Sequence, residues 1–109
     1  MGITRTDLFT PAQNELADLA KVLGHPARIA ILEFLLKAKT CINHDLVEDI
    51  GLAQATISQH LRELKTAGLI QGTVEGTRMC YCIDTQNWKK AQESIQGLFD
   101  LLPPDPNCC

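Results

Sequence analysis

The stretch that decides the fold runs from Asp45 to Ile70 and reads DLVEDIGLAQATISQHLRELKTAGLI. Its apolar residues repeat at helical spacing up to Ile50, a tight turn follows at Gly51-Leu52-Ala53, and a second helical repeat runs from Gln54 to Ala67. Gly68 favours the end of that repeat, because glycine readily adopts the left-handed conformation that ends helices. Two helices joined by a short glycine-containing turn form a helix-turn-helix.

The residues before this stretch predict two amphipathic helices and the start of a short one. Thr10 and Pro11 are an N-cap and a first helical position, and the helix that they begin extends to Gly24. His25-Pro26 starts a second helix, whose broad apolar face, with Ile29, Leu32 and Leu36 at helical spacing, predicts a central place in the core. Asn43 is a suitable N-cap for a short third helix that ends at Ile50.

The residues after Ile70 predict a β-hairpin. Apolar spacing changes there from helical to alternating, and Glu75-Gly76 between two extended runs marks the turn. In the second run, alternation divides the side chains between two faces, Met79, Tyr81 and Ile83 on one and Cys80 and Cys82 on the other. A hairpin that follows a helix-turn-helix makes the winged form of that motif.

The last part of the chain predicts one more helix and a tail. Asp84 or Thr85 caps a helix whose apolar stripe reaches Leu102 and which Pro103-Pro104 ends. We therefore expect a mainly α fold of the α+β class, a winged helix-turn-helix with five helices and a two-stranded β-hairpin. Residues 1–109 are expected to form one domain, with 1–9 an N-terminal extension and 103–109 a C-terminal tail that carries two cysteines.

Composition and charge limit the class of protein. The chain has 109 residues, of which 45% are hydrophobic and 21% charged, as in ordinary globular proteins. Its longest apolar stretch, Ile29 to Leu36, is far shorter than the roughly 20 residues of a membrane-spanning helix, and the N-terminus lacks an apolar signal core. We expect a cytoplasmic protein without a membrane segment.

The net charge of −3 argues against a polyanionic partner such as DNA. The distribution of the charged residues along the chain matters more than the net charge. The stretch from Gln54 to Cys82 is slightly basic, with three cations and two carboxylates: Arg62, Lys65, Arg78, Glu63 and Glu75. Amide and hydroxyl side chains on the outward face of the 54–67 helix can read base edges, whereas cations hold phosphates. The alternative for an isolated polar helix face is that it is merely solvated.

Three stretches together resemble the ArsR/SmtB family of bacterial repressors. They are DLVEDIGLAQATISQHLRELKTAGLI, the preceding LGHPARIAILEFLL with its Pro-x-Arg motif, and EGTRMCYCI in the wing, so the resemblance covers about residues 16 to 83. It implies a homodimer through the first and last helices and a roughly palindromic operator in double-stranded DNA.

The resemblance also implies which residues contact DNA. By position, six residues fall where family members touch DNA: Gln54, Ala55, Thr56, Ser58, Gln59 and His60. Thr56 and Gln59 are the main candidates for base readout. Independently of the resemblance, the charge of Arg62 is expected to hold phosphates, and Arg78 beside the hairpin tip is expected to reach the backbone or the minor groove of the flanking DNA. For His60 the alternative to DNA contact is a packed, hydrogen-bonded place in the protein, because it neighbours the core position Leu61.

The cysteines raise a separate question about a signal. The chain has five, an odd number without a secretory signal, so reduced thiols are expected rather than disulfides. Thiols in that number favour soft-metal or redox chemistry, and the alternative for each is a small hydrophobic residue. Cys80 and Cys82 are about 7 Å apart on one strand face, too far for an easy disulfide, and are expected to be partly buried.

Members of the family usually release DNA when a metal or metalloid binds, and two of their sites do not match this chain. Thr40-Cys41-Ile42-Asn43-His44 keeps only one thiol of a Cys-Val-Cys arrangement. The segment from Asp84 to Leu102 contains no histidine for a zinc site. Of the three histidines, His25, His44 and His60, the first precedes a proline and is expected to be structural.

Asn107-Cys108-Cys109 resembles a third arrangement, adjacent cysteines near the end of the dimerisation helix. Arsenite and antimonite, As(III) and Sb(III), are soft and take three thiolates, so we expect Cys108, Cys109 and Cys41 to bind such an inducer. The alternatives are an incidental tail and a thiol switch of the same fold that responds to oxidants or sulfide. No cofactor is expected. An enzyme is not expected either, since no catalytic constellation appears in the sequence.

Overall fold

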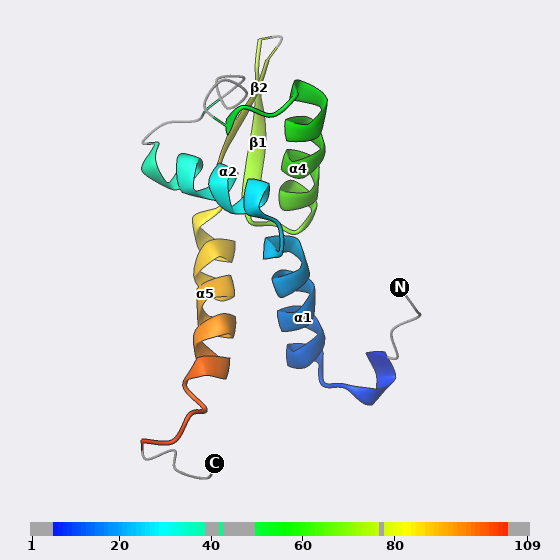
Figure 1. Ribbon diagram of the computed structural model, residues 1–109, viewed down its shortest axis with the longest axis vertical. Coiled ribbons are helices and arrows are strands. Elements are labelled where there is room, and N and C mark those ends of the chain that lie inside the picture. Colours follow the sequence, from blue (N-terminus) through cyan, green and yellow to red (C-terminus); the bar gives the residue numbers. More distant parts are fainter. Residues whose placement is uncertain (1–5, 39–41, 43–49, 77, 105–109) are drawn as a thin grey trace.

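Figure 1 shows the computed structural model, which describes residues 6–38, 42, 50–76 and 78–104. The elements in chain order are a 3-10 turn η1 (Thr6–Leu8), α1 (Pro11–Leu23), α2 (Pro26–Lys37), α4 (Gln54–Thr66), β1 (Ile70–Glu75), β2 (Arg78–Ile83) and α5 (Thr85–Phe99). The described part of the chain thus has four α-helices where the sequence predicts five. The expected third helix falls on residues 43–49, which lie outside the described residues.

Local capping explains where most of these helices begin. Thr10 caps α1 in a reciprocal capping box with Gln13, as its sequence predicts. The His25 side chain accepts a hydrogen bond from the Ala27 amide and so caps α2. Of the two candidates for α5, Asp84 is the cap. These starts are local features, because each depends on side chains within three residues of the helix end.

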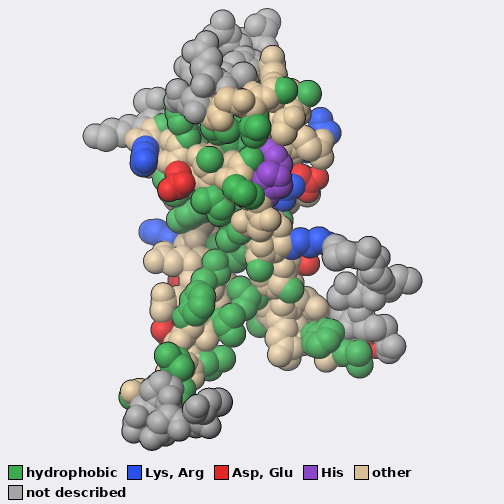
Figure 2. All heavy atoms as spheres, viewed as in Figure 1, with side chains coloured by type: hydrophobic (Ala, Val, Ile, Leu, Met, Phe, Trp, Pro, Cys, Tyr) green, Lys and Arg blue, Asp and Glu red, His purple; other side chains and the backbone are tan. Residues whose placement is uncertain are grey.

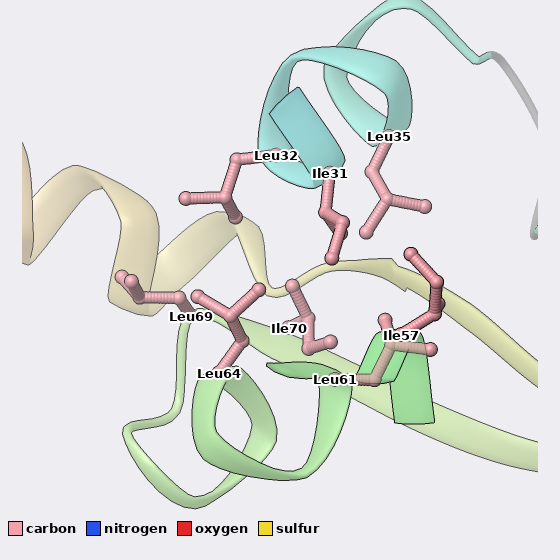
Figure 3. Packing of buried hydrophobic residues seen from close by; sticks show 8 residues of the cluster. All are labelled: Ile31, Leu32, Leu35, Ile57, Leu61, Leu64, Leu69 and Ile70. Carbon is pink, nitrogen blue, oxygen red and sulfur yellow. The ribbon is translucent and has the colours of Figure 1, made fainter. Parts of the chain in front are cut away.

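The core lies between α2, α4 and the start of the hairpin (Figure 3). The buried apolar side chains point toward one another from these three elements: Ile31, Leu32 and Leu35 from α2, Ile57, Leu61 and Leu64 from α4, and Leu69 and Ile70. The central place of the second helix is confirmed, but its buried face is not the expected one. Ile29 and Leu36 are 40% and 48% exposed, because α2 is apolar nearly all round and its neighbours select the face.

The hairpin forms in the predicted position. β1 and β2 pair antiparallel from Ile70 opposite Ile83 to Glu75 opposite Arg78, and Gly76 in the turn has a φ of 63°. Cys80 is the buried side chain of β2, whereas Met79, Tyr81 and Ile83 are half-buried, so the expected apolar face is not the more buried one. Tyr81 also forms an antiparallel bridge with Ile42.

α1 and α5 lie side by side and extend away from the rest of the molecule (Figure 1). Both helices are fully described, and neither contains a buried residue. α5 ends at Phe99 rather than at the expected prolines, because the chain tightens there into a turn with a hydrogen bond from the Leu102 amide to the Phe99 carbonyl. The helical conformation is also disfavoured for a residue that directly precedes a proline, because the proline ring clashes with it.

Among the described residues, no helix has both the length and the hydropathy required to cross a membrane.

Candidate nucleic-acid interface

The outward face of α4 is polar and uncovered within the described structure. The buried side chains of α4 lie on one side of the helix, as the spacing of Ile57, Leu61 and Leu64 requires. Six of the predicted DNA-contacting residues are exposed on the rest of the helix surface: Gln54, Ala55, Thr56, Ser58, Gln59 and Arg62. The fold therefore brings these six predicted residues together on one helix surface.

The start of α4 differs from the starts of the other described helices. Its N-cap residue is Ala53, which makes no side-chain cap hydrogen bond, whereas α1, α2 and α5 are each capped by a side chain. The first backbone N–H groups of a helix have no acceptor within the helix, and the helix dipole makes that end positive. The start of α4 thus retains donors that suit a phosphate oxygen.

Positive charge continues from α4 toward the hairpin. Arg62 and Lys65 are exposed on α4. The Lys65 ammonium lies over β1, where a Cβ added at Gly72 would be 3.4 Å from its Nζ. Glu63 faces Gln59 at a hydrogen-bond distance of 3.5 Å.

His60 does not share the exposed face. Its side chain is 6% exposed, and its Nδ1 accepts a hydrogen bond of 3.1 Å from Nε of Arg28. The ring of His25 packs against it with the centroids 4.3 Å apart. Burial, and then the neighbouring His25 and Arg28, hold the pKa of His60 below its ordinary value of 6.5. This environment favours the packed alternative for His60 over DNA contact.

Arg28 is a residue for which the sequence suggested no role. It lies on α2, is half-buried, and donates from Nη1 to the Val22 carbonyl at 3.2 Å as well as from Nε to His60. The only signal in the sequence is its place in the Pro-x-Arg motif at the start of a mostly apolar helix. Its partner 32 residues away cannot be found from local spacing.

The remaining predicted DNA residue belongs to the wing. Arg78 is the first residue of β2 and pairs with Glu75, and its side chain lies outside the described part of the structure. Val74 on β1 is 72% exposed, so the described end of the wing is open to solvent.

The predicted inducer site cannot be followed in the same way. Cys41, Cys108 and Cys109 lie outside the described residues, as does His44. Cys80 is buried and Cys82 half-buried, which agrees with their expected place in the strand. Within residues 6–38, 42, 50–76 and 78–104, no group of three or more His, Cys, Asp or Glu side chains is arranged to hold a metal ion.

Comparison with known proteins assigns a family to this arrangement. The model of the "Bacterial regulatory protein, arsR family" matches residues 25–71, from the cap of α2 to β1. The biofilm growth-associated repressor of Xylella fastidiosa is 35% identical over 100 residues, which cover 92% of this chain and 83% of that protein. This chain belongs to the ArsR family. The resemblance found in the sequence is thus confirmed.

Two further relatives of this ArsR-family chain extend the comparison. An uncharacterized HTH-type transcriptional regulator of Mycobacterium tuberculosis is 39% identical over 67 residues, which cover 62% of this chain and 59% of that protein. The chain thus spans little more than half the length of that relative. A winged helix-turn-helix domain from Mycobacterium bovis, solved in solution, matches with a TM-score of 0.63 at 24% identity and covers 92% of this chain and 90% of that one. That likeness identifies the fold as a winged helix-turn-helix.

Proposed function

We propose that this ArsR-family chain is a sequence-specific DNA-binding transcriptional repressor with α4 as its recognition helix. One observation carries the proposal: α4 presents an exposed polar face and an N-terminus without a side-chain cap next to an open wing. Helix-turn-helix proteins use such a helix in the major groove, with its N-terminal residues at the base edges. Thr56 and Gln59 read bases, and Arg62 and Lys65 bind phosphates.

The repressor acts as a homodimer through α1 and α5. Both helices carry apolar residues without burying any of them, and large apolar side chains at the end of α5 are exposed: Leu98 by 52%, Phe99 by 67%, Leu101 by 76% and Leu102 by 68%. A second copy would cover this surface. A symmetric pair of recognition helices would then read a palindromic operator.

The signal is a thiol-binding metalloid, As(III) or Sb(III), held by Cys108, Cys109 and Cys41. The support is chemical, since soft trivalent metalloids prefer thiolate ligands. Cys41 is bonded to Ile42, which pairs with Tyr81 in the wing, so a ligand at Cys41 acts one residue from the DNA-binding part of the fold. The bound inducer favours a conformation that fits the operator poorly.

DNA binding is tested by footprinting the purified protein on the DNA upstream of its own coding sequence. We expect protection of two symmetric half-sites and an affinity that falls steeply as salt rises, because phosphate contacts release counterions. An affinity that is absent or independent of salt would contradict the proposal and would reopen a thiol enzyme or a metal carrier as alternatives.

The inducer is tested by titrating arsenite against the protein–DNA complex. Wild-type protein should release DNA, a Cys108→Ser/Cys109→Ser double variant should retain it, and Cys82→Ser on β2 is the matched control that should behave as wild type. Equal release from the wild type and the double variant would exclude the C-terminal thiols. Release only after oxidation or sulfide treatment, with a linked cysteine pair seen by mass spectrometry, would instead support the thiol switch.

A further inference from the structure

Arg28 joins three helices through a single side chain. From α2 it donates to the carbonyl oxygen of Val22 near the end of α1, at 3.2 Å, and to Nδ1 of His60 on α4, at 3.1 Å. In Figure 2 the described histidines form one purple group at the level where α1 and α5 meet the upper part of the molecule. This contact therefore lies between the proposed dimerisation helix and the proposed recognition helix.

The hydrogen bond from Arg28 to His60 determines which ring nitrogen of His60 carries the proton. Since Arg28 Nε–H donates to Nδ1, that nitrogen carries a lone pair, and the neutral ring has its proton on Nε2. The groups that face the ring are the Arg28 guanidinium and the His25 ring, whose own Nδ1 accepts from the Ala27 amide. Burial and these two neighbours lower the pKa of His60, so the ring is neutral at pH 7.

We propose that Arg28 and His60 are positioning residues that couple α1 to the recognition helix α4, and that protonation of His60 breaks this coupling. The inference rests on the proposed function, because it assigns α1 to the dimer and α4 to DNA. A proton taken from solvent by Nδ1 would place an N–H against the Arg28 N–H, so the hydrogen bond is lost and two cations face each other. The angle between recognition helix and dimer is then no longer held by this contact.

The sign of the pH effect follows from the lowered pKa. The unfolded chain binds a proton at His60 more readily than the folded chain does, so the neutral ring contributes its full stability above pH 6.5. That contribution is lost as the pH falls below 6.5 and through the lower pKa of the folded state. Acidification should therefore loosen α4 and weaken operator binding.

The main test compares DNA affinity at about pH 7.5 and about pH 5.5, on the two sides of an ordinary histidine pKa. His60→Asn retains an acceptor near the position of Nδ1 but does not titrate. His25→Asn removes the other titratable ring that faces His60, and asparagine still caps the helix, so the comparison separates the titration of His60 from that of His25. Wild type and His25→Asn should lose about tenfold in affinity at the lower pH, as expected for one hydrogen bond to a charged group, whereas His60→Asn should lose under about twofold.

A second variant tests Arg28 directly. Arg28→Lys keeps the charge but cannot reach two acceptors with a planar fork, so affinity at about pH 7.5 should fall about tenfold and the pH dependence should shrink with it. An unchanged affinity and pH profile in Arg28→Lys would overturn its positioning role. An undiminished pH dependence in His60→Asn would overturn the role of His60 while DNA binding itself stands.

Amide hydrogen exchange keeps the inference testable if a variant fails to fold or DNA binding is absent. In wild-type protein, α4 amides should exchange faster relative to α2 amides at about pH 5.5 than at about pH 7.5, after correction for intrinsic rates. Equal relative protection at both pH values would contradict the coupling. Failure to bind DNA at about pH 7.5 with the exchange effect present would contradict only the proposed function.

Discussion

At the scale of single residues, Gln59 is exposed on the face of α4 opposite its buried side chains, where an amide can form paired hydrogen bonds to a base edge. We expect Gln59→Ala to lower operator affinity by about 1–3 kcal/mol and to relax specificity at one base pair. Binding to a set of operators with single base changes, measured by fluorescence anisotropy, checks this. Thr66→Ala, on the same exposed side at the far end of α4, is the control and should leave specificity unchanged.

Arg62 differs from Gln59 because its charge suits a phosphate rather than a base. Arg62→Gln should weaken binding to all sequences to a similar degree and reduce the salt dependence of log affinity by about one unit of slope. Lys21→Gln removes an equal charge from an exposed position on α1 and should change neither quantity. A sequence-dependent loss in Arg62→Gln would assign that residue to base readout instead.

Ala53 allows stability and binding to be separated. Ala53→Asp supplies the cap that α4 lacks and should stabilise the protein by about 0.5–2 kcal/mol in urea unfolding. The same carboxylate should repel a phosphate at the helix start, so DNA affinity should fall. Ala53→Ser caps α4 without the charge and should stabilise the protein with a much smaller loss of affinity. A parallel rise of stability and affinity in Ala53→Asp would argue against phosphate binding at this helix start.

At the scale of elements, the junction of α4 and α5 depends on Gly68. Its φ is +85°, its carbonyl accepts from Nδ2 of Asn87 on α5 at 3.0 Å, and an added Cβ would lie 3.0 Å from that nitrogen. Gly68→Ala should therefore lower the free energy of unfolding by about 1–3 kcal/mol, from left-handed strain and from disturbance of the Asn87 contact.

Gly76 is the matched control for this prediction. Its φ is +63° and an added Cβ would meet nothing within 4 Å, so Gly76→Ala introduces the backbone strain alone. Urea unfolding should show a smaller loss than in Gly68→Ala, within about 1–2 kcal/mol. Equal losses would mean that the contact with Asn87 contributes nothing.

At the scale of the whole molecule, the proposed dimer accounts for the exposed apolar end of α5. A Leu98→Glu/Phe99→Glu double variant should sediment as a monomer and bind a two-half-site operator at least about tenfold more weakly. The reason is that the two recognition helices are no longer linked, so the second half-site has to bind a separate monomer. Val74→Thr removes an exposed apolar residue of the wing and should leave the dimer intact. A monomeric wild type at micromolar concentration would contradict the dimer.

The cysteines mark the limit of sequence reasoning in this chain. Their number and spacing predict thiol chemistry, and Cys80 and Cys82 lie in the wing strand as expected. Which thiols meet depends on contacts between segments far apart in sequence, and Cys41, Cys108 and Cys109 lie outside the described residues. The inducer site therefore stays a prediction that the arsenite titration decides.

The sequence by itself determined the local features: the cap at Thr10, the left-handed glycines that end α4 and turn the hairpin, and the polar face of α4. Each depends on side chains a few residues apart, so periodicity and turn chemistry are sufficient. Only the tertiary structure decided which face of α2 is buried, because apolar residues occur nearly all round that helix. It also placed His60 inside against Arg28, because that contact joins residues 32 positions apart and depends on how the helices pack.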